Sequence, residues 1–178
     1  MATNYITDDV RKIIGAQSDW VEVCHPVEAS EVRRFFQAVM DPNPRYWDAS
    51  RISSERYTQP VAPPGFPVHA TRRPPNEVED PLDRSGDADA DFDGASRAFR
   101  PGLPRVPVPL AGTLNGGYEY EFFSYAAVGE RILWRSRYRD VYQRDGKTGA
   151  LIFVAMEDEY ATSDGRPLLT AVNTQIMR

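Results

Sequence analysis

Four strand-like runs in the C-terminal part place the strongest constraint on the fold of this chain of 178 residues. They cover residues 118–122, 132–142, 151–162 and 168–177, and the first two alternate between apolar and charged side chains. Turn signals separate the runs, at Val128-Gly129-Glu130, Asp145-Gly146 and Asp164-Gly165. Strands joined this closely pair antiparallel, because a parallel connection needs about a dozen residues or more. The sequence therefore predicts an antiparallel sheet.

The N-terminal part of the chain is predicted to be mainly helical. Residues 8–14 resemble a short helix, and residues 20–24 alternate as a strand does. Residues 30–40 carry apolar side chains at the i, i+3, i+4, i+7 and i+8 spacing of one helix face, namely Val32, Phe35, Phe36, Val39 and Met40. The pair Asp41-Pro42 is expected to end this helix. A helix followed by an antiparallel sheet predicts an α+β fold.

The middle of the chain is rich in proline. Many of the 15 prolines and 12 glycines fall between Gln59 and Gly117, where regular structure is hard to sustain. An acidic stretch, residues 77–93, lies between two groups of prolines. Its alternating aspartates lack the glycine and glutamate of a calcium-binding EF-hand loop, so we expect a solvated loop. The sequence predicts one domain over residues 1–178, with a long irregular acidic and proline-rich insert at about 63–112.

Composition excludes several classes of function. The net charge of −5 argues against a general nucleic-acid binder, which needs a basic face. No apolar run is long enough to span a membrane, and the N-terminal residues lack the apolar core of a secretion signal. The single cysteine, Cys24, excludes an intramolecular disulfide and favours the cytoplasm. His25 and His69 are the only histidines and have no second ligand at metal spacing, so no metal site is expected. No cofactor is predicted either.

Several stretches in order along the chain resemble one family. Residues 35–48, which include Asp41-Pro42-Asn43-Pro44-Arg45-Tyr46, resemble the hydratase motif of MaoC-like proteins, in which a helix runs into Asp-x-Asn-Pro-x-His. Val61-Ala62-Pro63-Pro64 resembles the Ala-Pro-Pro of the N-terminal, FAS-type branch of that family. Leu114-Asn115-Gly116-Gly117, Val128-Gly129-Glu130 and residues 142–149 resemble the sheet and hairpins of that branch. The resemblance runs from about residue 14 to the C-terminus, interrupted by the proline-rich middle.

The resemblance implies a hot-dog fold, an antiparallel sheet wrapped around a central helix. In this chain proline-rich sequence stands where that helix is expected, which implies a shortened or replaced helix and a wider cavity. The family's enzymes hydrate 2-enoyl thioesters, or dehydrate 3-hydroxyacyl thioesters, carried on coenzyme A or acyl carrier protein. The resemblance makes six residues candidates for binding the substrate: Asn43, Pro64, Gly65, His69, Asn115 and Gly116. For His69 the favoured alternative is a position on the surface.

Two departures from the family pattern concern catalysis. Tyr46 stands where the motif has the histidine that activates water with the aspartate, here Asp41. A phenol has an ordinary pKa of about 10, so at neutral pH it is a hydrogen-bond donor and a poor base. Pro63-Pro64 stands where the active branch has His-Gly, and proline lacks the N–H that an oxyanion hole uses. The two departures together predict a catalytically degenerate chain, with Asp41 and Tyr46 as its catalytic candidates.

The sequence leaves the roles of four residues open. Asp41 either anchors water or stabilises the turn after its helix, and Tyr46 either lines the pocket or packs in the core. Arg135 and Arg137, on one face of the strand at 132–142, are candidates for binding phosphates of coenzyme A or the acidic surface of a carrier protein. The alternative is that these arginines belong to a solvated outer face of the sheet.

Three functions are therefore considered. The first is the non-catalytic subunit of a heteromeric 2-enoyl-thioester hydratase or 3-hydroxyacyl-thioester dehydratase, paired edge to edge with a catalytically complete MaoC-like subunit and shaping the acyl pocket. The second is a self-sufficient homodimeric dehydratase, isomerase or cyclase that works through Asp41 or Tyr46. The third is a non-enzymatic module that binds acyl thioesters.

Overall fold

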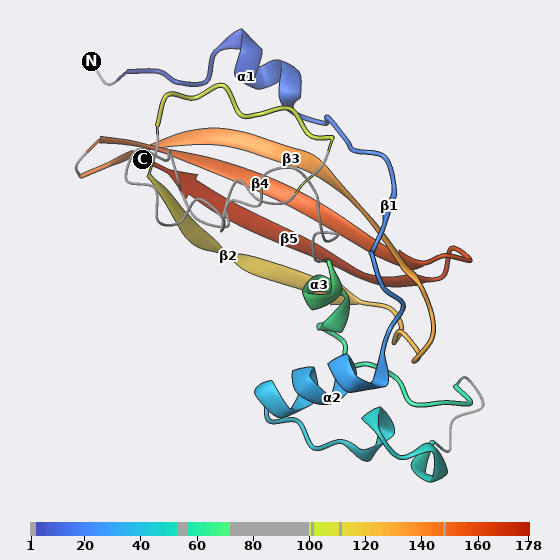
Figure 1. Cartoon of the computed structure of the whole chain (residues 1–178). Helices are drawn as coiled ribbons and strands as arrows, with labels where there is room; N and C mark the ends of the chain where they lie inside the picture. Colours follow the sequence, from blue (N-terminus) through green and yellow to red (C-terminus); the bar gives the residue numbers. More distant parts are fainter. Residues whose placement is uncertain (1–2, 53–56, 72–99, 101, 111, 148) are drawn as a thin grey trace, which may run out of the picture.

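A five-stranded antiparallel sheet dominates the computed structural model (Figure 1). The structure describes residues 3–52, 57–71, 100, 102–110, 112–147 and 149–178. In sheet order the strands are β1 (Val21–Glu22), β3 (Ile132–Gly146), β4 (Gly149–Thr162), β5 (Pro167–Met177) and β2 (Thr113–Phe122). The helices are α1 (Asp8–Ile13), α2 (Ala29–Ala38) and α3 (Phe66–Ala70), with the short 3-10 turns η1 (Pro44–Tyr46) and η2 (Ala49–Arg51). The predicted α+β arrangement is confirmed.

The two faces of the sheet differ in chemistry. Cross-strand partners share a face, and the pairs Trp134–Tyr160, Ser136–Asp158 and Tyr138–Met156 define what we call the inner face. Its other members on β5 and β2 follow from the same register: Ala171, Asn173, Gln175, Tyr118, Tyr120 and Phe122. The opposite, outer face of β3 and β4 carries the cross-strand pairs Arg135–Glu159 and Arg137–Glu157. The inner face is the one that packs against the helices and the segment 103–110.

Two apolar clusters cover the inner face. Near one end of the strands, Trp134, Tyr160 and Ala171 pack with residues of α2 and α3. Near the other end, Tyr138 and Met156 pack with α1 and with the segment 103–110. Three buried polar residues, Ser136, Asp158 and Asn173, lie between these clusters along β3, β4 and β5. Buried polar residues therefore lie between the two apolar clusters near the middle of the sheet, Ser136 opposite Asp158 and Asn173 opposite Met156.

The second helix is shorter than the sequence predicts. It ends at Ala38, and Met40 adopts a left-handed conformation with φ of 56°. The N–H of Asp41 donates to the carbonyl of Phe36, and the N–H of Met40 to that of Gln37, which is the Schellman pattern of a helix end. Val39 and Met40 are consequently 51% and 86% exposed and do not extend the buried helix face. The inclusion of these two residues in that face was wrong.

A bulge changes the predicted faces of β3. The pairing of β3 with β4 shifts between Tyr138 and Asp140, so the side-chain alternation reverses beyond this point. Val141 is buried on the inner side, whereas Tyr142 stacks on Phe153 of the outer side with ring centroids 4.9 Å apart. The prediction that Tyr142 shares a face with Ile132 and Trp134 was therefore wrong.

The segment at the place of the central helix is short, as predicted. α3 has five residues, with Pro67 in its first turn. Leu103, Val106, Val108 and Leu110 of the later segment pack on the inner-face cluster around Tyr138. The acidic stretch at 77–93 lies outside the described residues. Among the described residues, non-helical chain thus covers part of the inner face.

Candidate functional site

The motif residues form a tight turn directly after α2. Asp41 receives two hydrogen bonds: its Oδ1 accepts from the N–H of Asn43 at 3.2 Å, and its Oδ2 accepts from the hydroxyl of Tyr46 at 2.9 Å. Asn43 caps η1, its Oδ1 accepting from the N–H of Arg45 at 3.2 Å. Both Asp41 and Asn43 therefore stabilise the turn, which supports the structural role considered for Asp41.

Tyr46 is a core residue whose hydroxyl is hydrogen-bonded to Asp41. It is 5% exposed and stacks on Phe36 of α2, with ring centroids 6.0 Å apart. Burial, followed by the hydrogen bond to Asp41, raises the pKa of Tyr46 far above the ordinary phenol value. Tyr46 is therefore a neutral donor at physiological pH and cannot serve as the base that the motif histidine provides.

Tyr46 should make the protein sensitive to alkali. Its phenol ionises near pH 10 in the unfolded chain and at higher pH in the folded chain, so wild-type stability falls as pH rises above about 10. Between pH 9 and 11 the free energy of unfolding should fall in both proteins, and we expect the fall in Tyr46→Phe to be smaller than in the wild type by about 1 kcal/mol. Urea denaturation at both pH values measures the difference. Parallel losses in the two proteins would contradict the assignment.

Arg45 of the motif contacts Tyr125, a residue that sequence analysis missed. Nη1 of Arg45 donates to the hydroxyl of Tyr125 at 3.2 Å, and Cζ of the same guanidinium lies 5.4 Å from the centre of that ring. The hydroxyl of Tyr57 in turn accepts from the N–H of Tyr125 at 2.8 Å. Tyr125 is 80 residues from Arg45, so only the fold brings them together. These contacts tie the motif turn to the loop after β2.

The segment before α3 is held against the same loop. The N–H of Ala62 donates to the carbonyl of Ala126 at 2.7 Å, and the N–H of Phe66 donates to the carbonyl of Pro63 at 2.9 Å. Pro63 and Pro64 have no N–H, and Gly65 stands at the start of α3. Neither residue 63 nor residue 64 can therefore donate a backbone hydrogen bond.

His69 lies on a different side of α2 from Tyr46. Its ring packs on Phe35, with centroids 5.2 Å apart, and its Nε2 is 3.7 Å from Oε2 of Glu31. Phe35 and Phe36 are consecutive on the helix and point in different directions, so His69 and Tyr46 contact different sides of it. His69 lines a cavity of about 760 Å³ together with Cys24 and His25. The structure does not place His69 beside Asp41.

Asn115 and Gly116 lie on β2, away from the motif turn. Asn115 lines a hollow of about 350 Å³ on the inner face, and its Oδ1 accepts from the N–H of Gly117 at 3.0 Å. Gly116 lies at a bulge of the β2–β5 pairing, where an added Cβ would be 2.8 Å from the carbonyl oxygen of Thr174. The absence of a side chain at Gly116 thus allows close backbone packing. The substrate-binding candidates do not form one cluster.

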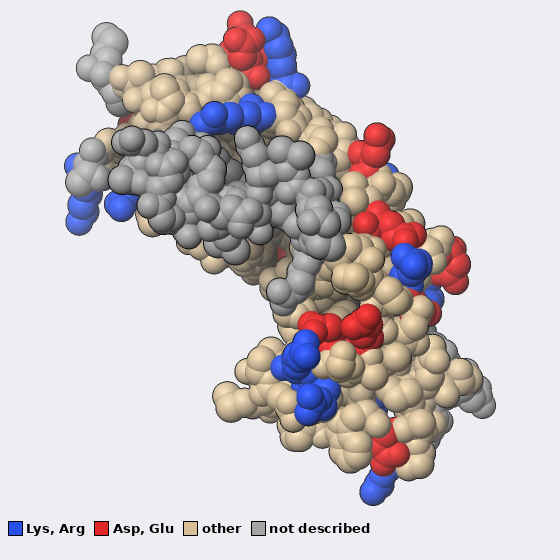
Figure 2. Space-filling view, in the orientation of Figure 1, with Lys and Arg blue, Asp and Glu red and all other residues tan. Residues whose placement is uncertain are grey.

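Arg135 and Arg137 both have carboxylate partners on β4. Nη2 of Arg135 is 2.7 Å from Glu159, and Nη2 of Arg137 is 2.5 Å from Glu157. The guanidinium of Arg135 also lies 4.5 Å from the centre of the Trp20 ring. Acidic and basic side chains are similarly interspersed on the face shown in Figure 2. These pairs favour the alternative that both arginines belong to a charged outer face.

The part of the chain that the structure describes contains no group of three or more metal-ligating side chains close enough to hold an ion. Within the same residues, no helix is both long and apolar enough to cross a membrane.

A comparison with protein families shows to which family the chain belongs. The family model of the FAS1-like dehydratase domain region matches residues 12–171. The chain belongs to this family of MaoC-like dehydratase domains. A UPF0336 protein of Thermobifida fusca is 24% identical over 159 residues, which cover 88% of each chain.

Solved structures of MaoC-like proteins share the fold. The ChsH1-ChsH2 complex from Mycobacterium tuberculosis contains a chain with a TM-score of 0.68 and 19% identity, covering 96% of this chain and 89% of the other. The HadBC (3R-hydroxyacyl-ACP dehydratase) complex from the same organism gives a TM-score of 0.57 at 17% identity, covering 92% and 96%. The (R)-hydratase from A. caviae gives 0.56 at 12% identity, covering 91% and 94%. The predicted hot-dog fold is confirmed.

Proposed function

We propose that this FAS1-like dehydratase domain is the non-catalytic subunit of a heteromeric 2-enoyl-thioester hydratase or 3-hydroxyacyl-thioester dehydratase. One observation carries the proposal: the residue at the position of the motif histidine is a buried tyrosine whose hydroxyl binds the motif aspartate. Hydration requires a base with a pKa near neutrality and an activated water. Tyr46 has a raised pKa, and each oxygen of Asp41 already accepts a hydrogen bond.

The chain would contribute half of a joined sheet and part of the acyl pocket. Two structural relatives come from complexes of two different named chains, ChsH1-ChsH2 and HadBC. We place the motif histidine and the oxyanion hole in a catalytically complete hot-dog partner, and the acyl thioester, on coenzyme A or carrier protein, at the interface. The single cysteine fits a cytoplasmic enzyme.

The long edge strand β2 is the surface we assign to that partner. In the described residues β2 pairs only with β5, so its other edge presents unpaired backbone groups. Its inner-face side chains Tyr118, Tyr120 and Phe122 are 47%, 45% and 52% exposed and form a stacked row. An exposed aromatic row beside an open edge is typical of an interface. A second hot-dog sheet pairing along β2 would cover both features.

The role of Asp41 distinguishes this proposal from a self-sufficient enzyme. We expect the isolated chain to lack hydratase activity on 2-enoyl-CoA, and Asp41→Asn to change the turnover of the complex by less than about threefold. The assay follows the loss of enoyl-thioester absorbance for the chain alone and for the complex that co-purifies from the native source. Activity of the isolated chain that falls strongly in Asp41→Asn would instead establish the homodimeric enzyme.

A further inference from the structure

The proline-rich segment 103–110 lies across the inner face of the sheet. Its prolines are exposed, and its apolar side chains are half-buried and pack on the cluster around Tyr138, namely Leu103, Val106, Val108 and Leu110. Because proline has no N–H, such a sequence cannot pair as a regular strand. The segment therefore covers the sheet without extending it.

Polar contacts anchor this segment to the sheet only at its start. The hydroxyl of Tyr138 donates to the carbonyl of Pro104 at 2.9 Å, and the guanidinium of Arg100 donates to both oxygens of Asp158. Between residues 105 and 110, the described part of the chain shows no hydrogen bond from the segment to the sheet. An apolar ligand can therefore lie between the two without breaking a hydrogen bond.

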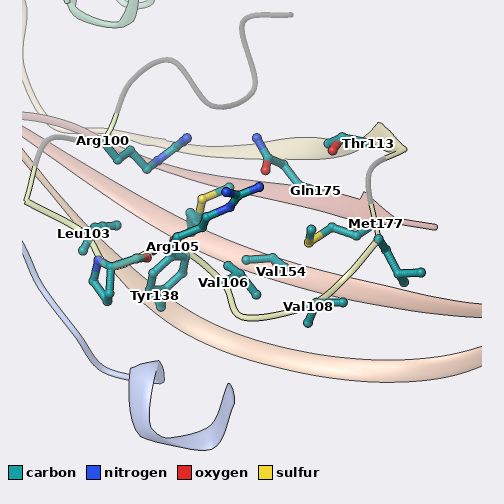
Figure 3. Close-up of a pocket in the computed structure, with 13 residues that line it drawn as sticks. Arg100, Leu103, Arg105, Val106, Val108, Thr113, Tyr138, Val154, Gln175 and Met177 are labelled. Atoms are coloured by element: carbon teal, nitrogen blue, oxygen red, sulfur yellow. Dashed lines mark hydrogen bonds between the residues drawn. The ribbon is translucent and has the colours of Figure 1, made fainter. Parts of the chain in front are cut away.

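A hollow of about 300 Å³ lies between the segment and the sheet. Figure 3 shows Val106 and Val108 of the segment and Val154 and Met177 of the sheet converging on it. Met156 adds to the same apolar wall. This volume is at the lower end of the range for small-molecule sites. It suits an alkyl chain of medium length.

The charged side chains that line this hollow are all basic. Arg100 and Arg105 both line it, and none of the described lining residues is an aspartate or a glutamate. Arg100 is neutralised by Asp158, with which it forms an ion pair. Arg105 is exposed and makes no hydrogen bond or ion pair within the described residues. The hollow therefore has one positive charge that no described side chain compensates.

Arg105 is placed to act on a ligand in the hollow. In Figure 3 its side chain extends over the hollow toward the side where Gln175 lies, and Val108 lies on the other side. A guanidinium presents N–H donors in a planar fork that matches a carboxylate. An apolar wall and a basic rim together match a molecule with an alkyl chain and an anionic end.

We propose that this hollow binds a medium-chain monocarboxylate, with its alkyl chain between the segment and the sheet and its carboxylate at Arg105. The thioester group of an acyl thioester is uncharged and would leave Arg105 without a partner, so the site favours the free acid. It lies at the end of the sheet that packs with α1, whereas the motif turn follows α2 at the other end (Figure 1). The proposal is therefore independent of which chain supplies the catalytic histidine.

The test compares octanoate with 1-octanol, which has the same chain length and no charge. Isothermal titration calorimetry measures both dissociation constants for the full chain, together with any partner that co-purifies. We expect octanoate to bind about tenfold more tightly, the lower end for a hydrogen bond to a charged group because Arg105 is exposed to solvent. In Arg105→Gln the preference should fall to about threefold or less, with octanol unaffected.

Two more variants control for the place of binding. Val106→Phe fills the hollow and should weaken the binding of both ligands by about tenfold or more. Arg33→Gln removes an exposed arginine of α2, outside the hollow, and should keep the wild-type affinities. Arg105 is exposed, so Arg105→Gln should fold normally and decides the test even if Val106→Phe does not fold.

Three results would overturn the inference. The first is the absence of octanoate binding to the wild type at millimolar concentration. The second is an equal affinity for octanoate and octanol, or a preference that survives Arg105→Gln. The third is octanoate binding that is unchanged in a folded Val106→Phe, because the ligand would then lie elsewhere.

Discussion

Replacing Arg100 with alanine is expected to lower the free energy of unfolding by about 3–5 kcal/mol, because the change leaves a buried carboxylate without its cation. Asp158 is 4% exposed and receives two hydrogen bonds from Arg100, at 2.9 and 2.6 Å, beside one from the hydroxyl of Ser136. The arginine is also the described residue that begins the segment lying over the inner face. Its loss should therefore loosen Leu103 and Val106 as well. Chemical denaturation followed by circular dichroism measures the change.

Two further variants test whether the effect of Arg100→Ala comes from the buried ion pair between Arg100 and Asp158. Arg11→Ala removes an exposed ion pair with Asp8, whose side chain is 90% exposed, and should cost less than about 1 kcal/mol. Arg100→Met combined with Asp158→Leu removes both charges and should recover much of the loss, because apolar side chains of similar size often replace buried ion pairs at little cost. If Arg100→Ala were no more damaging than Arg11→Ala, the pair would not hold the segment to the sheet.

Placing a charge on the edge strand should separate the chain from its partner. Tyr120 lies at the centre of the aromatic row on β2, between Tyr118 and Phe122 at 5.7 and 5.8 Å. Central aromatic residues of an interface typically contribute 2 kcal/mol or more, so Tyr120→Asp should weaken the complex by at least about 30-fold. The neighbouring Glu119 and Glu121 add like charge on the same strand. Sedimentation velocity over a concentration series measures the dissociation constant.

The matched control is another exposed aromatic residue. Trp47 is 57% exposed and lies at the end of η1, outside β2. Trp47→Asp should leave the complex intact, and both variants should keep the circular dichroism spectrum of the folded chain. If the complex tolerates Tyr120→Asp but dissociates in Trp47→Asp, the interface lies at the motif turn and not along β2.

Local sequence patterns predicted most of the strands and their neighbours. Alternating residues and glycine turns locate β3, β4 and β5 because side chains on a strand alternate with a period of two and short turns force adjacent strands to pair. The same reasoning failed at Tyr142, since a one-residue bulge reverses the alternation without any local signal in the sequence. It failed at Met40 because a helix end depends on which carbonyls the last N–H groups reach.

The motif at residues 41–46 shows which features the sequence determines and which depend on the tertiary structure. The sequence by itself shows a tyrosine at position 46, where the family motif that it resembles has histidine, and prolines at positions 63 and 64. Only the fold decided that Tyr46 is buried and donates to Asp41. Likewise, Arg100 and Asp158 are 58 residues apart. Pairs at such separation, and the hollows between them, depend on how the sheet and the irregular segment pack, which no local pattern in one sequence encodes.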